Sequence, residues 1–245
     1  MKTAERILER QEKQNTRPIL IACLGDSVTH GVFELEWYND PDGALKFKCF
    51  CRPWLCYPML LQRELQEKYP FAAVTVYNAG VNGDGTVGAL ARLERDVLSR
   101  QPDLVTVNLG LNDCNRGMEH IGEYAKNMGE IFDKIFASGS EVMLVTPNHM
   151  CAYHAKNLPD TEQLRAFTKG FIQKQVDGVL DAYVEAARNE AKKRNIPVAD
   201  TYQLWDEMKN NGIDTTALLA NGINHPYPEQ HELFRNVIMQ TLFDK

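Results

Sequence analysis

The chain has 245 residues, a formal net charge of −6 at pH 7, 44% hydrophobic residues and 24% charged residues. These values are typical of a soluble globular protein and argue against nucleic acid or an anionic membrane surface as the principal partner. The length allows one sizeable core, so we expect a single domain over residues 1–245.

The first segment, residues 1–17, is polar and charged and lacks an apolar core of signal-peptide length. No other stretch approaches the roughly 18 continuous apolar residues that a membrane span needs. We therefore expect a cytoplasmic protein with no membrane partner. The six cysteines are too sparse for a disulfide scaffold. Cys49, Cys51 and Cys56 cluster, but no His or Cys pair follows at zinc-site spacing, so no metal is predicted.

An apolar run from Ile19 to Leu24 is typical of a buried parallel strand. Gly25-Asp26-Ser27 breaks this pattern at the carboxyl end of the strand, where open α/β sheets place their chemistry. Ser27 fits two roles at this stage: a functional hydroxyl, or an N-cap for the following helix. The choice depends on residues further along the chain.

Residues 33–57 show no clean period of 2 or 3.6 and contain Pro41, Gly43 and Pro53, so we predict a long loop inserted into the domain. This segment carries seven of the 22 aromatic residues of the chain: Phe33, Trp37, Tyr38, Phe47, Phe50, Trp54 and Tyr57. Two interpretations stay open, namely a wall or lid over a site and a hydrophobic cluster packed under the loop.

Beyond this segment, strand-like and helix-like patterns alternate, which is typical of a parallel sheet covered on both faces. Strands are expected at 74–77, 104–109, 141–145 and 196–199. Helices are expected around 61–69, 90–97, 124–135, 176–187 and 202–208, and after Pro228. Residues 148–161 are expected to form a second irregular loop. Its candidate site-lining side chains, each of which could instead face solvent, are His149, Tyr153 and His154.

Polar residues follow the expected strands. A glycine-rich connection over residues 78–86 allows backbone N–H groups to approach a ligand closely. It has neither the GxGxxG pattern nor the Gly-Lys-Ser/Thr ending of a phosphate-binding loop, so a nucleotide or flavin site is disfavoured. The strand at 104–109 runs into Gly110-Leu111-Asn112-Asp113, and Asn224-His225-Pro226 precedes the last helix.

Four of these blocks, in this order, resemble the SGNH/GDSL hydrolase superfamily: Gly25-Asp26-Ser27, residues 78–83, Gly110-Leu111-Asn112-Asp113 and Asn224-His225-Pro226. The resemblance extends from Ile19 to His225 in outline. It implies a flavodoxin-like three-layer α/β/α sandwich, with about five parallel strands here, that hydrolyses esters, thioesters or acetylated sugars. Such enzymes usually need no metal, so no cofactor is expected. The pattern is not the GxSxG elbow of α/β-hydrolases.

Acyl transfer needs a nucleophile, a base and donors for the oxyanion. We predict Ser27 as the nucleophile and His225 as the base. The predicted oxyanion donors are the backbone N–H groups of Ser27 and Gly83 and the side-chain amide of Asn112. Two other histidines are weighed against His225: His30, close to Ser27, and His231, for which a packed or solvent-facing role is expected. Asp26 and Asp113 are expected to hold turns and caps.

The third catalytic group departs from the family pattern. Many relatives have Asp-x-x-His, but Gly222 occupies the Asp position here. Three alternatives stay open. Ser27 and His225 work as a dyad, Asn221 accepts a hydrogen bond from the imidazole N–H, or Asp214 serves as an acid from further upstream.

The leading hypothesis is a serine esterase for short acyl groups, with an O-acetylated carbohydrate or a similar small ester as substrate. A non-catalytic sugar-binding or acyl-binding protein of the same fold, and an acyltransferase that uses the same residues, are the alternatives. Lipase action on long chains is less favoured because no interfacial apolar helix is apparent. A homo-oligomer is neither required nor excluded.

Overall fold

The computed structural model describes residues 1–14 and 17–244. Within them, a five-stranded parallel sheet has the order β4-β1-β5-β6-β7. Its strands are β1 (Ile19–Gly25), β4 (Val74–Gly80), β5 (Leu104–Asn108), β6 (Glu141–Val145) and β7 (Val198–Ala199). β1 and β5 lie at its centre and are almost entirely buried, which explains their continuous apolar sequences. The predicted α/β fold is confirmed.

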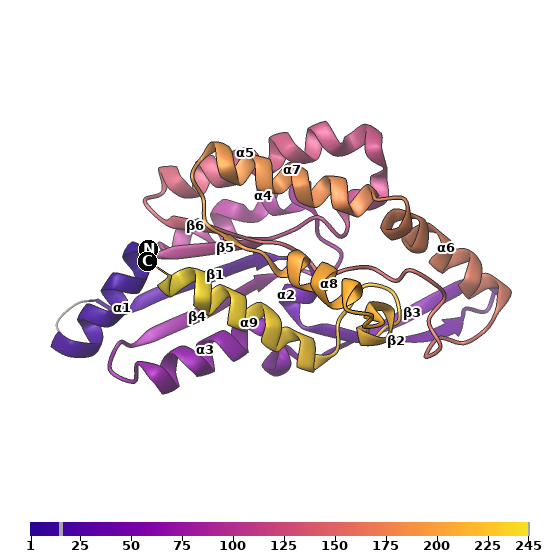
Figure 1. The fold of residues 1–245 in the computed structure, drawn as a ribbon, viewed down its shortest axis with the longest axis horizontal. Coiled ribbons are helices and arrows are strands. Elements are labelled where there is room, and N and C mark those ends of the chain that lie inside the picture. Colours follow the sequence, from indigo (N-terminus) through magenta and orange to yellow (C-terminus); the bar gives the residue numbers. More distant parts are fainter. Residues whose placement is uncertain (15–16, 245) are drawn as a thin grey trace.

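Helices cover both faces of the sheet, which gives the predicted three layers (Figure 1). One face carries α4 (Thr86–Asp96), α5 (Ile121–Ala137) and α7 (Val179–Lys193), and the opposite face carries α1 (Lys2–Lys13), α3 (Tyr57–Lys68) and α9 (Pro228–Phe243). The remaining α-helices in the described residues are α2 (Ser27–His30), α6 (Glu162–Val176) and α8 (Thr201–Asn210). Short 3₁₀ turns occur at η1 (Pro53–Leu55), η2 (Leu98–Arg100), η3 (Asp113–Arg116), η4 (Met118–His120) and η5 (Thr215–Leu218).

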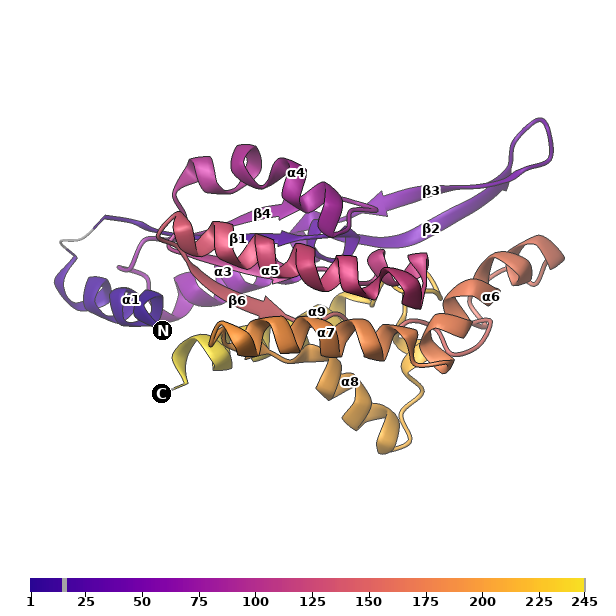
Figure 2. The ribbon, with the colours of Figure 1, turned by 90° about the horizontal axis from the view of Figure 1, so that it is seen from above.

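The segment at 33–57 is not the loop that the sequence predicted, because most of it forms a β-hairpin. β2 (Val32–Asn39) and β3 (Leu45–Cys51) pair antiparallel and extend beyond the main sheet, as Figure 2 shows. Trp37 pairs with Phe47 on one face, and Glu36 pairs with Lys48 on the other. The period of 2 is therefore present in both strands, but the turn at 40–44 divides it into two short runs. Whether the hairpin moves as a lid stays a prediction.

Two helices lie where the sequence predicted none. α1 buries only Thr3, Ala4 and Ile7, so its apolar stripe is too narrow to stand out among charged residues. α6 begins after Thr161, whose hydroxyl accepts a hydrogen bond from the Leu164 N–H, and it lies opposite the hairpin (Figure 2). The irregular connection at 148–161 is confirmed. No helix in the described part of the chain has the length and apolar character required to cross a membrane.

Candidate active site

Ser27 lies directly after β1, an interior strand of the sheet, where the chain turns into α2. Asp26 is the N-cap of that helix, because its Oδ1 accepts a hydrogen bond from the Val28 N–H at 2.9 Å. The cap interpretation of Ser27 is therefore wrong, and its hydroxyl is available for another partner. The tight turn requires glycine at position 25, since a Cβ there would lie 2.0 Å from Thr29 Oγ1.

His225 provides that partner, although 198 residues separate it from Ser27 along the chain. Its Nε2 lies 2.8 Å from Ser27 Oγ, and both side chains are buried. Burial lowers the pKa of His225 to about 4, although the nearby Phe33 backbone acts to raise this pKa. The imidazole is therefore neutral at pH 7, which is the form that accepts a proton from a hydroxyl.

Asn221 does not accept a hydrogen bond from the imidazole, which was one of the three alternatives that the sequence left open. Its Oδ1 accepts hydrogen bonds from three backbone N–H groups, those of Ile223 at 3.0 Å, Asn224 at 2.9 Å and His225 at 2.9 Å. This oxygen is therefore occupied in shaping the turn that presents His225. Among the described residues, Nδ1 of His225 has no aligned hydrogen-bond partner.

Asp214 is also not the missing acid. One of its carboxylate oxygens accepts a hydrogen bond from the Tyr153 hydroxyl, and the other caps η5 through the Ala217 N–H. The arrangement in the described residues is therefore a Ser27–His225 pair without a carboxylate on the imidazole.

The predicted oxyanion donors lie around the same cavity, whose volume is about 180 Å³. Ser27, Gly83, Asn112, Asn221 and His225 all line it. Gly83 has a φ of +77°, so the backbone conformation itself favours glycine, and a Cβ there would extend into open space. Asn112 donates one hydrogen bond from Nδ2 to the Asp84 carbonyl at 2.7 Å, which fixes the orientation of its amide.

The mouth of the cavity has an apolar wall from two elements that the sequence did not predict. Leu35, Phe47 and Cys49 come from the hairpin, and Phe167 and Phe171 come from α6. The described residues that line this cavity include no charged side chain. The spacing of Leu164, Phe167 and Phe171 is the helical signal that would have revealed α6.

Trp37 joins the hairpin to α6 behind this wall. Its ring centroid lies 5.3 Å from that of Phe47 and 5.2 Å from that of Phe167. Both interpretations of the aromatic segment therefore hold in part, because it packs against α6 and also borders the cavity.

The remaining candidate histidines do not line the cavity. His231 is part of the core: its Nδ1 accepts a hydrogen bond from the Tyr57 N–H at 3.1 Å, and burial lowers its pKa to about 3. His149 contacts Asp206, and His154 contacts Thr168. His30 is among neither the partners of Ser27 nor the residues of the cavity in the described structure.

The acidic residues near Ser27 hold turns, as expected. Asp113 Oδ1 accepts hydrogen bonds from the backbone N–H and the hydroxyl of Thr86, and Asp26 caps α2. Burial raises the pKa of Asp26 to about 7. No group of three or more His, Cys, Asp or Glu side chains placed to hold a metal ion occurs in residues 1–14 and 17–244. The structure describes all six cysteines, and each is a free thiol.

Comparisons with known proteins identify the family of this chain. The sequence profile of the GDSL-like Lipase/Acylhydrolase family matches residues 23–233. The chain is 26% identical over 180 residues to an acetylxylan esterase of Geobacillus stearothermophilus, with 69% of this chain and 78% of the relative covered. It is 37% identical over 87 residues to Esterase TesA of Pseudomonas aeruginosa, a match that spans 35% of this chain and 41% of that protein.

Solved structures show the same fold. The crystal structure of Axe2, an acetylxylan esterase from Geobacillus stearothermophilus, superposes with a TM-score of 0.64 at 19% identity and covers 93% of this chain and 95% of Axe2. LAE5, an α/β hydrolase from the Lake Arreo metagenome, gives a TM-score of 0.64 at 21% identity, with 91% and 94% covered. The family profile spans most of the sequence, and the four blocks that carry the resemblance lie at one end of the sheet. The chain therefore belongs to the GDSL-like lipase/acylhydrolase family.

Proposed function

We propose that this protein is a carboxylic ester hydrolase that cleaves esters of short acyl groups through an acyl-enzyme at Ser27, with His225 as the base. The observation that carries the proposal is the 2.8 Å contact between His225 Nε2 and Ser27 Oγ in a cavity that Gly83 and Asn112 also line. A nucleophile, a neutral base and two sources of oxyanion donors thus share one space.

The reaction follows from these positions. Nε2 of His225 takes the hydroxyl proton as Ser27 Oγ attacks the ester carbonyl. The oxyanion that forms accepts hydrogen bonds from the backbone N–H groups of Ser27 and Gly83 and from the second N–H of the Asn112 amide. The imidazolium then gives its proton to the departing alcohol. A water molecule, deprotonated in turn by His225, attacks the acyl-enzyme, and the free acid leaves as Ser27 recovers its proton.

The lining of the cavity supports a small neutral substrate. With no charged side chain at its surface, the cavity has no group to pair with a charged acyl or alcohol moiety. A volume of about 180 Å³ suits an acetyl group better than a long chain. Phe47 and Phe167 expose 45% and 39% of their surface at the mouth, where the face of a sugar ring or an aryl alcohol can pack. We therefore place an O-acetylated carbohydrate or a similar acetate ester in this cavity.

The test is release of nitrophenol from p-nitrophenyl acetate by the wild type, together with labelling of Ser27 by a serine-directed phosphonate. We expect both reactions in the wild type and neither in Ser27→Ala. The matched control is Ser99→Ala, which removes an exposed serine that does not line the cavity. A folded wild type that neither turns over nor reacts with the phosphonate contradicts the proposal and favours a sugar-binding or acyl-binding protein of the same fold.

Product analysis separates hydrolysis from acyl transfer to another acceptor. With acetylated xylo-oligosaccharide as substrate, we expect one free acetate for each ester bond cleaved. Rates on p-nitrophenyl acetate, butyrate and octanoate should fall in that order. A preference for the octanoate contradicts the assignment to short acyl groups.

A further inference from the structure

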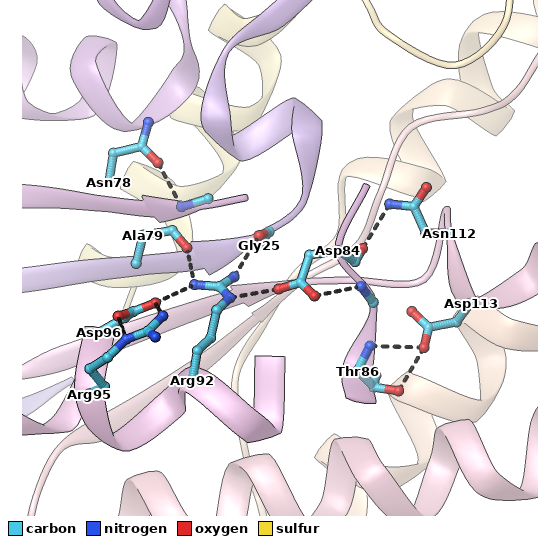
Figure 3. Close-up of polar contacts among 12 residues, drawn as sticks. Gly25, Asn78, Ala79, Asp84, Thr86, Arg92, Arg95, Asp96, Asn112 and Asp113 are labelled. Atoms are coloured by element: carbon cyan, nitrogen blue, oxygen red, sulfur yellow. Dashed lines mark hydrogen bonds and ion pairs between the residues drawn. The ribbon is translucent and has the colours of Figure 1, made fainter. Parts of the chain in front are cut away.

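Arg92 is a buried cation behind the oxyanion-hole segments. It lies on α4 and is only 7% exposed. Figure 3 shows its guanidinium extended from the helix towards the ends of two strands and the adjacent glycine-rich turn. It does not line the cavity that contains Ser27, so it has no direct access to substrate.

Three hydrogen bonds connect this guanidinium to three different segments. Its Nη2 donates to the Gly25 carbonyl at 3.1 Å, and its Nη1 donates to the Ala79 carbonyl at 2.7 Å. Its Nε donates to Asp84 Oδ2 at 2.6 Å. The planar fork of an arginine fixes the relative positions of such acceptors, which the single ammonium of a lysine does not.

Each donor of the oxyanion hole is attached to one of these segments. Gly25 precedes the Asp26–Ser27 turn, and Asp84 directly follows Gly83. The Asp84 carbonyl accepts the hydrogen bond that orients the Asn112 amide. One side chain therefore connects the two backbone donors and the side-chain donor (Figure 3).

A buried ion pair is a poor source of stability, because desolvation of both charges offsets their attraction. The side chains of Arg92 and Asp84 are 8% and 10% exposed. The Arg92–Asp84 ion pair contributes defined geometry, because charge-assisted hydrogen bonds hold short, defined distances. Oxyanion donors act only when they lie about 2.7–3.1 Å from the developing charge, and a displacement of about 1 Å costs on the order of 10²-fold in rate.

We propose that Arg92 is a positioning residue for the oxyanion hole, which acts through Gly25 and Asp84 to hold the donors of Ser27, Gly83 and Asn112 in one arrangement. This inference rests on the proposed function, because it assigns a role in the same reaction. It adds a buried cation that acts on the transition state without contacting it.

Two variants test the proposal. Arg92→Lys keeps the charge but loses the fork, and Asp84→Asn keeps the carbonyl that orients Asn112 but loses the ion pair. We expect each to lower kcat for p-nitrophenyl acetate by about 10- to 100-fold, with KM changed less than about threefold, and to slow phosphonate labelling in parallel. Arg63→Lys is the control, because Arg63 lies on α3, its side chain is 63% exposed and it pairs with Glu67, away from Arg92. It should keep wild-type kcat.

A double-mutant cycle distinguishes positioning from a general loss of stability. If Arg92 acts through the oxyanion donors, Arg92→Lys costs clearly less in an Asn112→Ala background than in the wild type. Folded Arg92→Lys and Asp84→Asn proteins with wild-type kcat, or fully additive losses in the cycle, overturn the inference while leaving the proposed function intact. If Arg92→Lys does not fold, Asp84→Asn alone decides. A wild type without turnover or labelling overturns both proposals.

Discussion

The two sides of the cavity are built differently. The inner side consists of Ser27, Gly83, Asn112 and His225, which short polar turns hold at the end of a buried sheet. The outer side consists of aromatic and aliphatic side chains from the β2–β3 hairpin and α6, two segments more than a hundred residues apart that meet only in the folded chain. We propose that the residues of the inner side carry out the reaction and that those of the outer side determine which substrate binds. The predictions below test this division.

The largest effect is expected at the proposed nucleophile and base on the inner side. Ser27→Ala and His225→Ala should each lower kcat by more than about 10³-fold, and the double variant should be no worse than either one, because the two groups act as a unit. Steady-state kinetics on p-nitrophenyl acetate measures this, with circular dichroism as the check on folding. Losses that multiply in the double variant would mean that the two side chains do not share a step.

The next effect concerns Asn112, the proposed side-chain donor to the oxyanion. Asn112→Ala should lower kcat by about 10²–10³-fold with little change in KM, because the donor acts on charge that develops only in the transition state. Asn189→Ala, at an exposed position on α7, is the control and should be silent. A loss of kcat below about tenfold would show that Asn112 has only the structural role of donating a hydrogen bond to the Asp84 carbonyl.

The pH dependence examines the base on the inner side. Because the buried imidazole has a pKa of about 4, it stays neutral well below pH 7, and kcat/KM should be flat above about pH 5. Below about pH 4 it should fall about tenfold per unit as the imidazole becomes protonated. His120→Gln, at an exposed position, should leave this limb unchanged. A limb near the ordinary histidine pKa of about 6.5 that persists in Asp26→Asn, and so does not come from the raised pKa of Asp26, would contradict the burial of His225.

The same shift has a consequence for stability. Between pH 6.5 and about 4 the unfolded chain binds a proton at His225 that the folded protein does not, so the contribution of His225 to the free energy of unfolding should decrease as the pH falls through this window. His231, with a pKa of about 3, acts in the same direction, whereas Asp26, with a pKa raised to about 7, acts in the opposite direction. Urea denaturation at pH 7 and at pH 4.5, compared between the wild type and His225→Gln, measures the contribution of His225.

The inner side could be predicted from the sequence for a physical reason. Buried parallel strands have continuous apolar sequences, and the residues at their carboxyl ends meet at one edge whatever the loops do. This argument predicts that Ser27, Gly83 and Asn112 share one edge of the sheet, and all three line the cavity. His225 follows no strand of the sheet, and its place in the site is what the resemblance to the SGNH/GDSL superfamily implies. The outer side could not be predicted in this way, because the approach of α6 to the hairpin depends on tertiary packing of Trp37 and Phe167.

The outer side should affect binding more than chemistry. Phe47→Ala and Phe167→Ala remove ring surface at the mouth of the cavity, and each should raise KM for an acetylated xylo-oligosaccharide by about tenfold, equivalent to about 1.4 kcal/mol, with kcat nearly unchanged. Phe50→Ala is the control, because Phe50 is exposed and does not line the cavity. Equal losses of kcat in both variants would mean that the wall also positions the reacting atoms.

The smallest effect on activity is expected for Gly222→Asp, which would restore the Asp-x-x-His pattern of the family. Gly222 occupies the position of the usual aspartate, with a φ of +66°, and a Cβ there would lie 2.6 Å from Asn157 Oδ1 and 2.8 Å from Leu158 Cγ. Gly222→Asp should therefore leave kcat no higher than in the wild type and lower the free energy of unfolding by about 1–3 kcal/mol, because the side chain meets both backbone strain and occupied space. Gly212→Asp is the matched control for the strain alone, because its φ is +82° and a Cβ there meets no neighbour within 4 Å. A clear rise in kcat for Gly222→Asp would show that the turn can rearrange to present a carboxylate to Nδ1 of His225. It would also show that a third catalytic group increases the activity of Ser27 and His225.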